Sequence, residues 1–184
     1  MWIIKILFSY FFYNIRKYLN NEHLKVIYYT MIYSRIKYGI CVYGLTKNEN
    51  IHKIQVMQNK LLKVIMEKKH RYPTSRLHND LNILKVEDLV KQDITALICK
   101  YLNNNLPAIF HKYFKTFKDI HNYNTRYCTN RLQIPIHYTI IGSMTVKIKG
   151  PIIWDSLNHR LRSIKNPKTF KIEYKLSILP YESN

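Results

Sequence analysis

The chain has 184 residues, of which 47% are apolar and 22% are charged, a composition that supplies a hydrophobic core and excludes an intrinsically disordered protein. Thirty Lys and Arg against 11 Asp and Glu leave a formal net charge of +19, which favours phosphate polymers or anionic membranes as partners. The abundance of Lys, Asn, Ile and Tyr leaves a biased base composition as an alternative source of this charge.

The N-terminal segment "MWIIKILFSYFFY" is apolar and aromatic, but Lys5 interrupts it and Asn14 closes it. A membrane-spanning helix needs about 20 apolar residues, so this segment is too short to span. It also has no basic region before the apolar run and no small-residue cleavage site, which argues against a signal peptide. We expect a buried or interfacial helix, with a membrane anchor as the alternative.

Two long helices are predicted next, because apolar residues recur at every third or fourth position. The first covers Asn21 to Ile40, and Gly39 and Gly44 then loosen the chain as structural residues before a polar turn. The second covers Ile51 to Lys69, with most of its lysines on the face opposite the apolar stripe.

Three further helices are predicted before residue 120. Pro73 ends the preceding element, and Thr74 or Ser75 is expected to cap a short helix that runs to about Asn82. Val86 to Tyr101 forms the next helix, which "NNNLP" breaks. A short helix is expected in "AIFHKYFKTF".

The pattern changes in the last third of the chain. Residues 132–150, "LQIPIHYTIIGSMTVKIKG", alternate apolar and polar side chains and predict a two-stranded β-ribbon. A helix is expected from Pro151 to about Ile164 and another from Pro167 to Ile178, with Trp154 and Phe170 as structural residues on their apolar faces. The expected fold is mainly α: a helical bundle followed by a short β-ribbon and two C-terminal helices.

Sequence signals for catalysis and for cofactor binding are missing. The five aspartates are dispersed, with no adjacent pair to hold metal ions for nucleotidyl transfer, and the four glycines form no phosphate-binding loop. Cys41, Cys99 and Cys128 are widely separated, which predicts neither a disulfide framework nor closely spaced zinc ligands. We therefore expect no cofactor, no metal and no small-molecule substrate, and an intracellular protein of the nucleus or cytoplasm that is not secreted.

Five separated strings occur in a specific order: "IRKYLNNEHLKVIYYTMIYSRIKYGICVYG", "IHKIQVMQNKLLKVI", "LNNNLPAIFHKYF", "HNYNTR" and "GPIIWDSLNHRLRSIKNPKTFK". In this order and spacing they resemble the C-terminal part of a non-LTR (LINE, jockey-like) retrotransposon reverse transcriptase, an RNA-directed DNA polymerase. The resemblance covers residues 15–181, and each string is weak alone.

The resemblance implies the thumb and post-thumb region of a decayed or truncated transposable element, without its endonuclease and palm. The thumb-like bundle would cover residues 1–120, and a hinge, the ribbon and the basic helices would cover residues 121–184. The two regions are expected to pack together as one compact unit. The Tyr-x-Asp-Asp catalytic motif of the family has no matching positions, so the chain alone is not expected to be an enzyme. Tyr43 replaces the usual Trp, Asp155 the usual Asn, and Asn158 a Pro.

A thumb holds primer and template through phosphates and groove shape, which carries little sequence information. The resemblance therefore implies non-specific contact with the RNA or DNA backbone. The candidate nucleic-acid-binding residues are basic side chains of the C-terminal third: Arg126, Arg131, Lys147, Lys149, Arg160 and Arg162.

The stretch "HNYNTRYCTN", residues 121–130, is interpreted as the hinge between the two regions, because Asn and Thr suit tight turns and caps. Within it, Arg126 either pairs with a carboxylate or carbonyl to lock the hinge or meets a phosphate. Two alternatives to nucleic-acid binding remain open: a protein-interaction or membrane-peripheral helical module, and an open reading frame without selected function.

Overall fold

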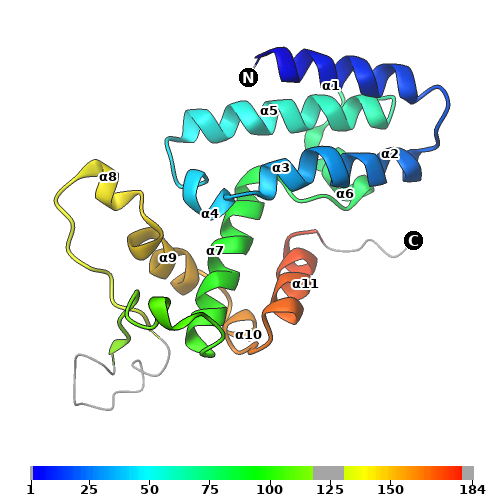
Figure 1. The fold of residues 1–184 in the computed structure, drawn as a ribbon. Coiled ribbons are helices and arrows are strands. Elements are labelled where there is room, and N and C mark those ends of the chain that lie inside the picture. The colour runs from blue at the N-terminus through cyan, green and yellow to red at the C-terminus, as the bar shows by residue number, and fades with distance from the viewer. Residues whose placement is uncertain (1, 118–130, 180–184) are drawn as a thin grey trace. The chain divides into compact units, whose positions relative to one another are not determined.

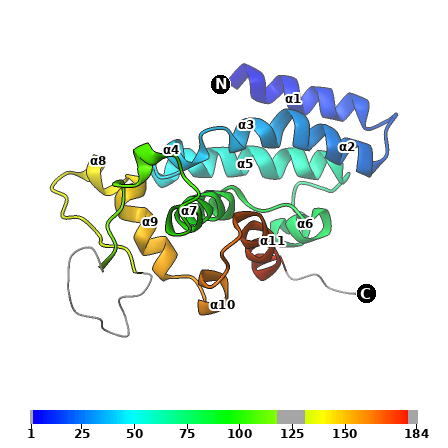
Figure 2. The same cartoon turned by 60° about the horizontal axis from the view of Figure 1, so that its bottom comes forward.

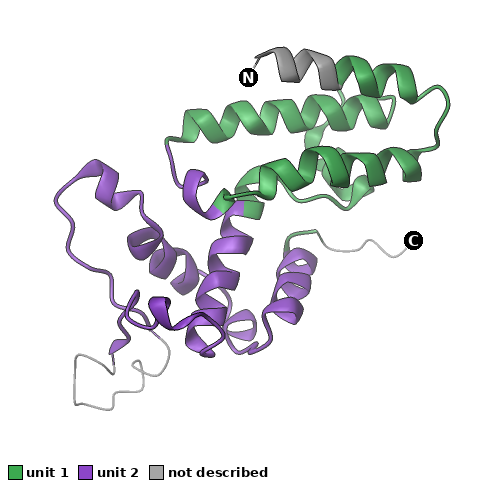
Figure 3. Ribbon diagram, in the orientation of Figure 1, with its two compact units in different colours: residues 1–40, 47–89, 178–184 green, residues 41–46, 90–177 purple. Residues whose placement is uncertain are grey.

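The computed structural model describes the backbone of residues 2–117 and 131–179 and, within these ranges, the side chains from Ser9 onward. Every regular element of the described ranges is a helix, so the prediction of a mainly α-helical chain is confirmed (Figure 1). The chain forms two compact units (Figure 3). Unit 1 comprises residues 1–40, 47–89 and 178–184, and unit 2 comprises residues 41–46 and 90–177. The predicted boundary between residues 120 and 121 lies outside the described residues.

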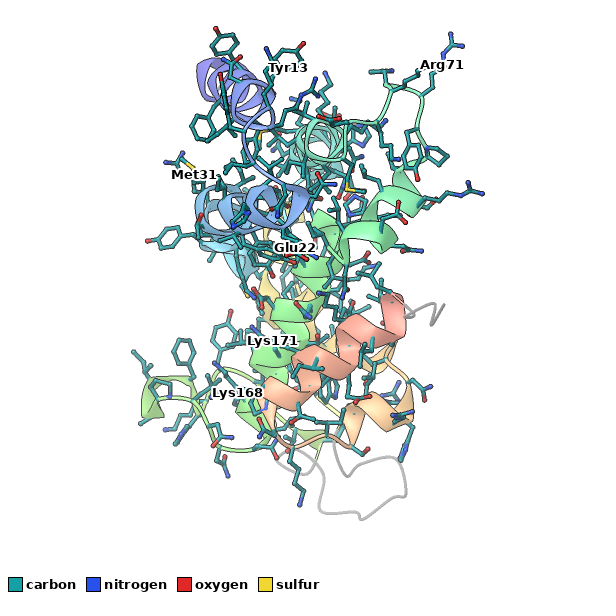
Figure 4. The ribbon with its side chains drawn as sticks, turned by 90° about the vertical axis from the view of Figure 1, so that its right-hand side faces the viewer. Tyr13, Glu22, Met31, Arg71, Lys168 and Lys171 are labelled. Carbon is teal, nitrogen blue, oxygen red and sulfur yellow. The ribbon has the colours of Figure 1, made fainter. Side chains whose placement is uncertain are left out.

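Unit 1 is built on the long helix α5 (Asn48–Ile65), against which α1 (Trp2–Ile15) and α2 (Asn21–Tyr28) pack (Figures 1 and 2). Helix α1 buries Phe12 and leaves Tyr13 exposed (Figure 4). The other helical segments of unit 1 are the π-helix η1 (Tyr29–Tyr33), α3 (Ser34–Lys37) and α6 (Thr74–Leu81).

The helix predicted from Asn21 to Ile40 forms as three consecutive segments, α2, η1 and α3, and ends at Lys37. Tyr38 then turns to extended backbone with ψ 116°, and Gly39 adopts φ +65°. This left-handed conformation costs glycine least, because it has no Cβ. Helix α4 (Ile40–Tyr43) follows directly, and Gly44 lies in the turn after it.

The next helices form close to their predicted positions. Helix α6 begins at Thr74, directly after Pro73 and without a side-chain cap, and ends where Asn82 adopts φ 53°. Helix α7 (Val86–Leu102) ends one residue beyond its predicted last residue. In "AIFHKYFKTF" only the 3-10 helix η2 (Ala108–Phe110) forms.

A buried amide links three parts of unit 1. Gln58 of α5 is 0% exposed, and its Nε2 donates to the hydroxyl of Tyr28 on α2 at 3.0 Å and to the carbonyl oxygen of Leu84 at 3.0 Å. Gln55, one turn earlier, donates to Gln58 Oε1 and accepts from the backbone N–H of Val86. Burial also raises the pKa of the Tyr28 hydroxyl, which therefore stays protonated. The network fixes α2 and the start of α7 against α5.

Unit 2 contains most of α7, from Val90 onward, and the shorter helices that follow it in the chain. Apart from η2, these are α8 (Ile140–Ser143), α9 (Val146–Asp155), α10 (His159–Arg162) and α11 (Pro167–Ile178). Helix α11 begins at Pro167 as predicted, and Asn166 Oδ1 accepts from the N–H of Lys168 at 2.9 Å.

The β-ribbon predicted for residues 132–150 is wrong. Among the described residues, Leu132 makes only an isolated antiparallel bridge with Thr116, and the later part of the segment folds into α8 and the start of α9. Thr139 promotes this outcome, because its Oγ1 accepts from the N–H of Gly142 at 3.0 Å and so caps α8. Thr145 occupies the N-cap position of α9, but its Oγ1 makes no cap and donates to the carbonyl oxygen of Gly142 at 2.8 Å.

The helix predicted to begin at Pro151 begins instead at Val146 and ends at Asp155. Pro151 lies inside α9, where it has no N–H to bond the carbonyl oxygen of Lys147. Five residues of α9 precede it, so Pro151 lies just beyond the first four N–H groups, which lack intrahelical partners in any case, and one intrahelical hydrogen bond is lost near the start of the helix. The predicted continuation to Ile164 forms as the separate helix α10.

Replacing Gln58 with Ala is expected to lower the free energy of unfolding by about 1–3 kcal/mol, since it leaves buried acceptors on Tyr28 and Leu84 without a donor. Urea denaturation followed by circular dichroism measures the change. Lys60→Ala, an exposed position on the same helix, is the control and should stay within about 0.5 kcal/mol of the original protein. Equal stability of the two variants would contradict the role given to the buried amide.

Candidate nucleic-acid interface

An aromatic stack joins two of the basic helices of unit 2. The rings of Trp154 on α9 and Phe170 on α11 lie 5.8 Å apart at an interplanar angle of 28°, and Tyr174 continues the cluster at 6.1 Å from Phe170. All three side chains are buried. Burial of such large rings supplies most of the stabilisation available to short helices.

Helix α9 also approaches α7 closely. A Cβ at Gly150 would lie 3.2 Å from Cδ1 of Ile98 and 3.7 Å from Cγ2 of Ile94, both on α7. Glycine at this position allows the two backbones to come together. The contact fixes the helix that carries Lys147 and Lys149.

Helix α11 is bonded to α7 by polar groups. Gln92 Nε2 donates to the carbonyl oxygen of Lys171 at 2.8 Å, and Lys171 Nζ donates to Asp93 Oδ1 at 2.6 Å. Figure 4 shows Lys168 and Lys171 on α11.

The segment between α10 and α11 is also bonded to α7, through the thiol of Cys99. Burial raises the pKa of this thiol, which therefore stays protonated and donates to the carbonyl oxygen of Ile164 at 3.3 Å.

The chain on either side of residues 118–130 is held together by the Thr116–Leu132 bridge. The N–H of Phe117 donates to the carbonyl oxygen of Arg131 at 3.2 Å, and the N–H of Gln133 donates to that of Lys115 at 2.8 Å. Arg126 and the predicted hinge "HNYNTRYCTN" lie outside the described residues, so their roles stay predictions.

The remaining five candidate residues differ in exposure. Lys147 is exposed, with its Nζ 6.0 Å from the ring centroid of Tyr113, and Lys149 is half-buried. On α10 the Arg160 side chain is 81% exposed. Arg162 is half-buried, and its buried Nε has no hydrogen-bond partner among the described residues. Residues two apart on a helix point in different directions, so the pairs on α9 and α10 do not each present one continuous face.

Two of the candidates are paired with carboxylates. Arg131 Nε donates to Asp155 Oδ2 at 2.9 Å, and an Arg160 terminal nitrogen donates to Glu173 Oε2 at 3.2 Å. The partners lie 24 and 13 residues away in sequence, so neither pair could be read from local spacing. The remaining donors of Arg160 are left for other acceptors.

The charge of unit 2 is strongly unbalanced. It contains 15 Lys and Arg against four Asp and Glu, and its described part contains 13 against three. All three described carboxylates form ion pairs, Asp93 with Lys171, Asp155 with Arg131 and Glu173 with Arg160. The described part therefore keeps a net charge of +10. Exposed lysines outside the predicted set contribute to it, namely Lys91, Lys100, Lys112, Lys115, Lys165 and Lys168.

No group of three or more His, Cys, Asp or Glu side chains that could hold a metal ion occurs in the described ranges. Within the same ranges, no helix is both long and apolar enough to cross a membrane. Comparison of the chain with protein-family models, with curated proteins and with solved structures gives no match. The function is therefore inferred from the residues of this chain.

Replacing Trp154 with Ala is expected to lower the free energy of unfolding by about 3–5 kcal/mol, because it removes a buried ring that joins α9 to α11. Thermal unfolding measures the loss. Ile152→Ala on the same helix, where the side chain is 51% exposed, is the control and should cost less than about 1 kcal/mol. A Trp154 variant as stable as this control would show that the stack does not hold unit 2 together.

Proposed function

We propose that the chain is a non-catalytic protein related to the thumb and post-thumb region of a non-LTR retrotransposon reverse transcriptase, and that it binds the backbone of RNA or DNA without sequence preference. The order of the five sequence strings supports the relationship. The helical fold is compatible with it. The observation that carries the binding proposal is the net charge of +10 that the described part of unit 2 keeps, although each of its carboxylates is ion-paired.

Basic side chains on a packed scaffold suit phosphate recognition. Lys147 and Arg160 are the strongest candidates for direct contact, because both are exposed. The guanidinium of Arg160 has five N–H donors, and its pairing with Glu173 uses one of its nitrogens, so the others are left for a phosphate. Such contacts release counterions from the nucleic acid and do not read its bases.

The surroundings of the aspartates support the non-catalytic part of the proposal. Asp93 and Asp155 are ion-paired with Lys171 and Arg131, and Asp80 accepts from the hydroxyl of Tyr72 at 3.1 Å. Metal-dependent nucleotidyl transfer requires carboxylates that converge on the same cations.

Filter binding of a short RNA–DNA hybrid over a salt series tests the binding proposal. The logarithm of the affinity is expected to fall linearly with the logarithm of the salt concentration, by about 0.7 to 0.9 per phosphate contacted. Lys147→Ala and Arg160→Ala should each remove about one phosphate contact and so reduce the steepness of this slope by about 0.7 to 0.9. Both should weaken binding to all sequences alike. Lys53→Ala and Lys60→Ala, exposed positions on α5 in unit 1, are the matched controls and should leave the slope unchanged.

Absence of retention at low salt would refute the binding proposal, as would an equal effect of the control variants. The relationship to a retroelement is tested separately by the genomic DNA before the codon for Met1. An intact or broken palm-coding region there would support it, and a promoter with no such remnant would count against it.

A further inference from the structure

Residues 132–138, "LQIPIHY", have the alternating pattern of a β-strand but almost no strand pairing. The described residues supply one bridge, between Leu132 and Thr116. Beyond Gln133, no backbone N–H or carbonyl group of residues 134–138 bonds to any described residue. A segment with strand preference and open backbone groups is a template for pairing with another chain.

The apolar side chains of this segment are also uncovered. Ile136 is 83% exposed and Tyr138 is 94% exposed, and Ile140 and Ile141 of the adjoining helix α8 are 76% and 81% exposed. Single exposed apolar residues are common on protein surfaces, whereas four within six residues point to an interaction site.

Pro135, the single proline of the segment, lies at a position where it does not block strand pairing at the outer edge. The N–H of Gln133 bonds to Lys115, so in an extended strand the odd-numbered residues face this inner edge. Pro135 belongs to that inner edge. Its missing N–H therefore removes no hydrogen-bond donor from the outer edge. The outer edge keeps the backbone donors of Ile134, Ile136 and Tyr138.

Charge selects the kind of partner. No Asp or Glu occurs between Asp119 and Asp155, and Asp155 is paired with Arg131. Lys115, whose carbonyl oxygen bonds to Gln133, is exposed, as is Lys147 on α9. A second copy of the chain would bring a second strongly basic unit 2 to this edge, whereas an acidic partner is attracted to it.

We propose that residues 134–138 are the docking edge for an extended segment of another protein that is apolar at alternate positions and rich in Asp and Glu. The segment adds a β-strand to the outer edge. Main-chain hydrogen bonds hold it, its apolar side chains cover the exposed isoleucines, and its carboxylates face the surrounding lysines. This proposal does not depend on nucleic-acid binding.

Fluorescence anisotropy with a short labelled peptide that alternates valine and glutamate tests the proposal on the full chain. Ile136→Pro is expected to weaken binding by roughly tenfold or more, because it removes a donor of the outer edge. The matched control His137→Pro changes the inner edge and should stay within about threefold. Methylation of alternate peptide nitrogens, which removes the N–H groups that pair with the edge, should abolish binding, as should replacement of every glutamate with lysine.

Failure of the valine–glutamate peptide to bind would overturn the proposal. So would binding that survives both Ile136→Pro and methylation of the peptide nitrogens, because it would not involve strand pairing. Dimerisation that Ile136→Pro abolishes would assign the edge to a second copy of the chain and would equally overturn the acidic partner. Circular dichroism checks that the variants are folded, and the methylated peptide keeps the test valid on the unaltered chain if one is not.

Discussion

Contact between Trp154 and Phe170 is the interaction on which the basic part of the molecule depends. Helices α9, α10 and α11 have 10, four and 12 residues, lengths at which isolated helices are marginal in water. They also carry many like charges, whose mutual repulsion opposes compaction. Apolar burial between α9 and α11, with the close approach at Gly150, offsets both effects. The cationic side chains are thereby held on a packed scaffold.

The few carboxylates of unit 2 orient cations without neutralising the surface. Exposed ion pairs contribute at most about 1 kcal/mol, so the contacts of Asp155 with Arg131 and of Glu173 with Arg160 matter more for position than for stability. Charges separated by less than a Debye length, about 8 Å at physiological salt, still act together on an approaching polyanion. This arrangement favours contact with a phosphate backbone, and the same excess of positive charge underlies the proposed docking of an acidic segment at residues 134–138.

Sequence reasoning succeeded where the signal is local. Periodicity located α5 and α7, and the Asn-Pro cap located the start of α11. It failed at residues 132–150, since the alternating side chains fit a strand while Thr139 caps helix α8, and the described residues offer the segment only one bridge for pairing. The basic residues of the site could be named from composition, but the ion pairs of Arg131 and Arg160 depend on tertiary contacts that no local pattern encodes.

Chemical modification of lysines, read by mass spectrometry with and without an RNA–DNA hybrid, tests the central claim that unit 2 binds nucleic acid. The account predicts that the hybrid slows modification of the exposed Lys147, Lys165 and Lys168 in unit 2 and leaves that of the exposed Lys53 and Lys60 in unit 1 unchanged. Unchanged modification of all five lysines, or equal protection in both units, would contradict it.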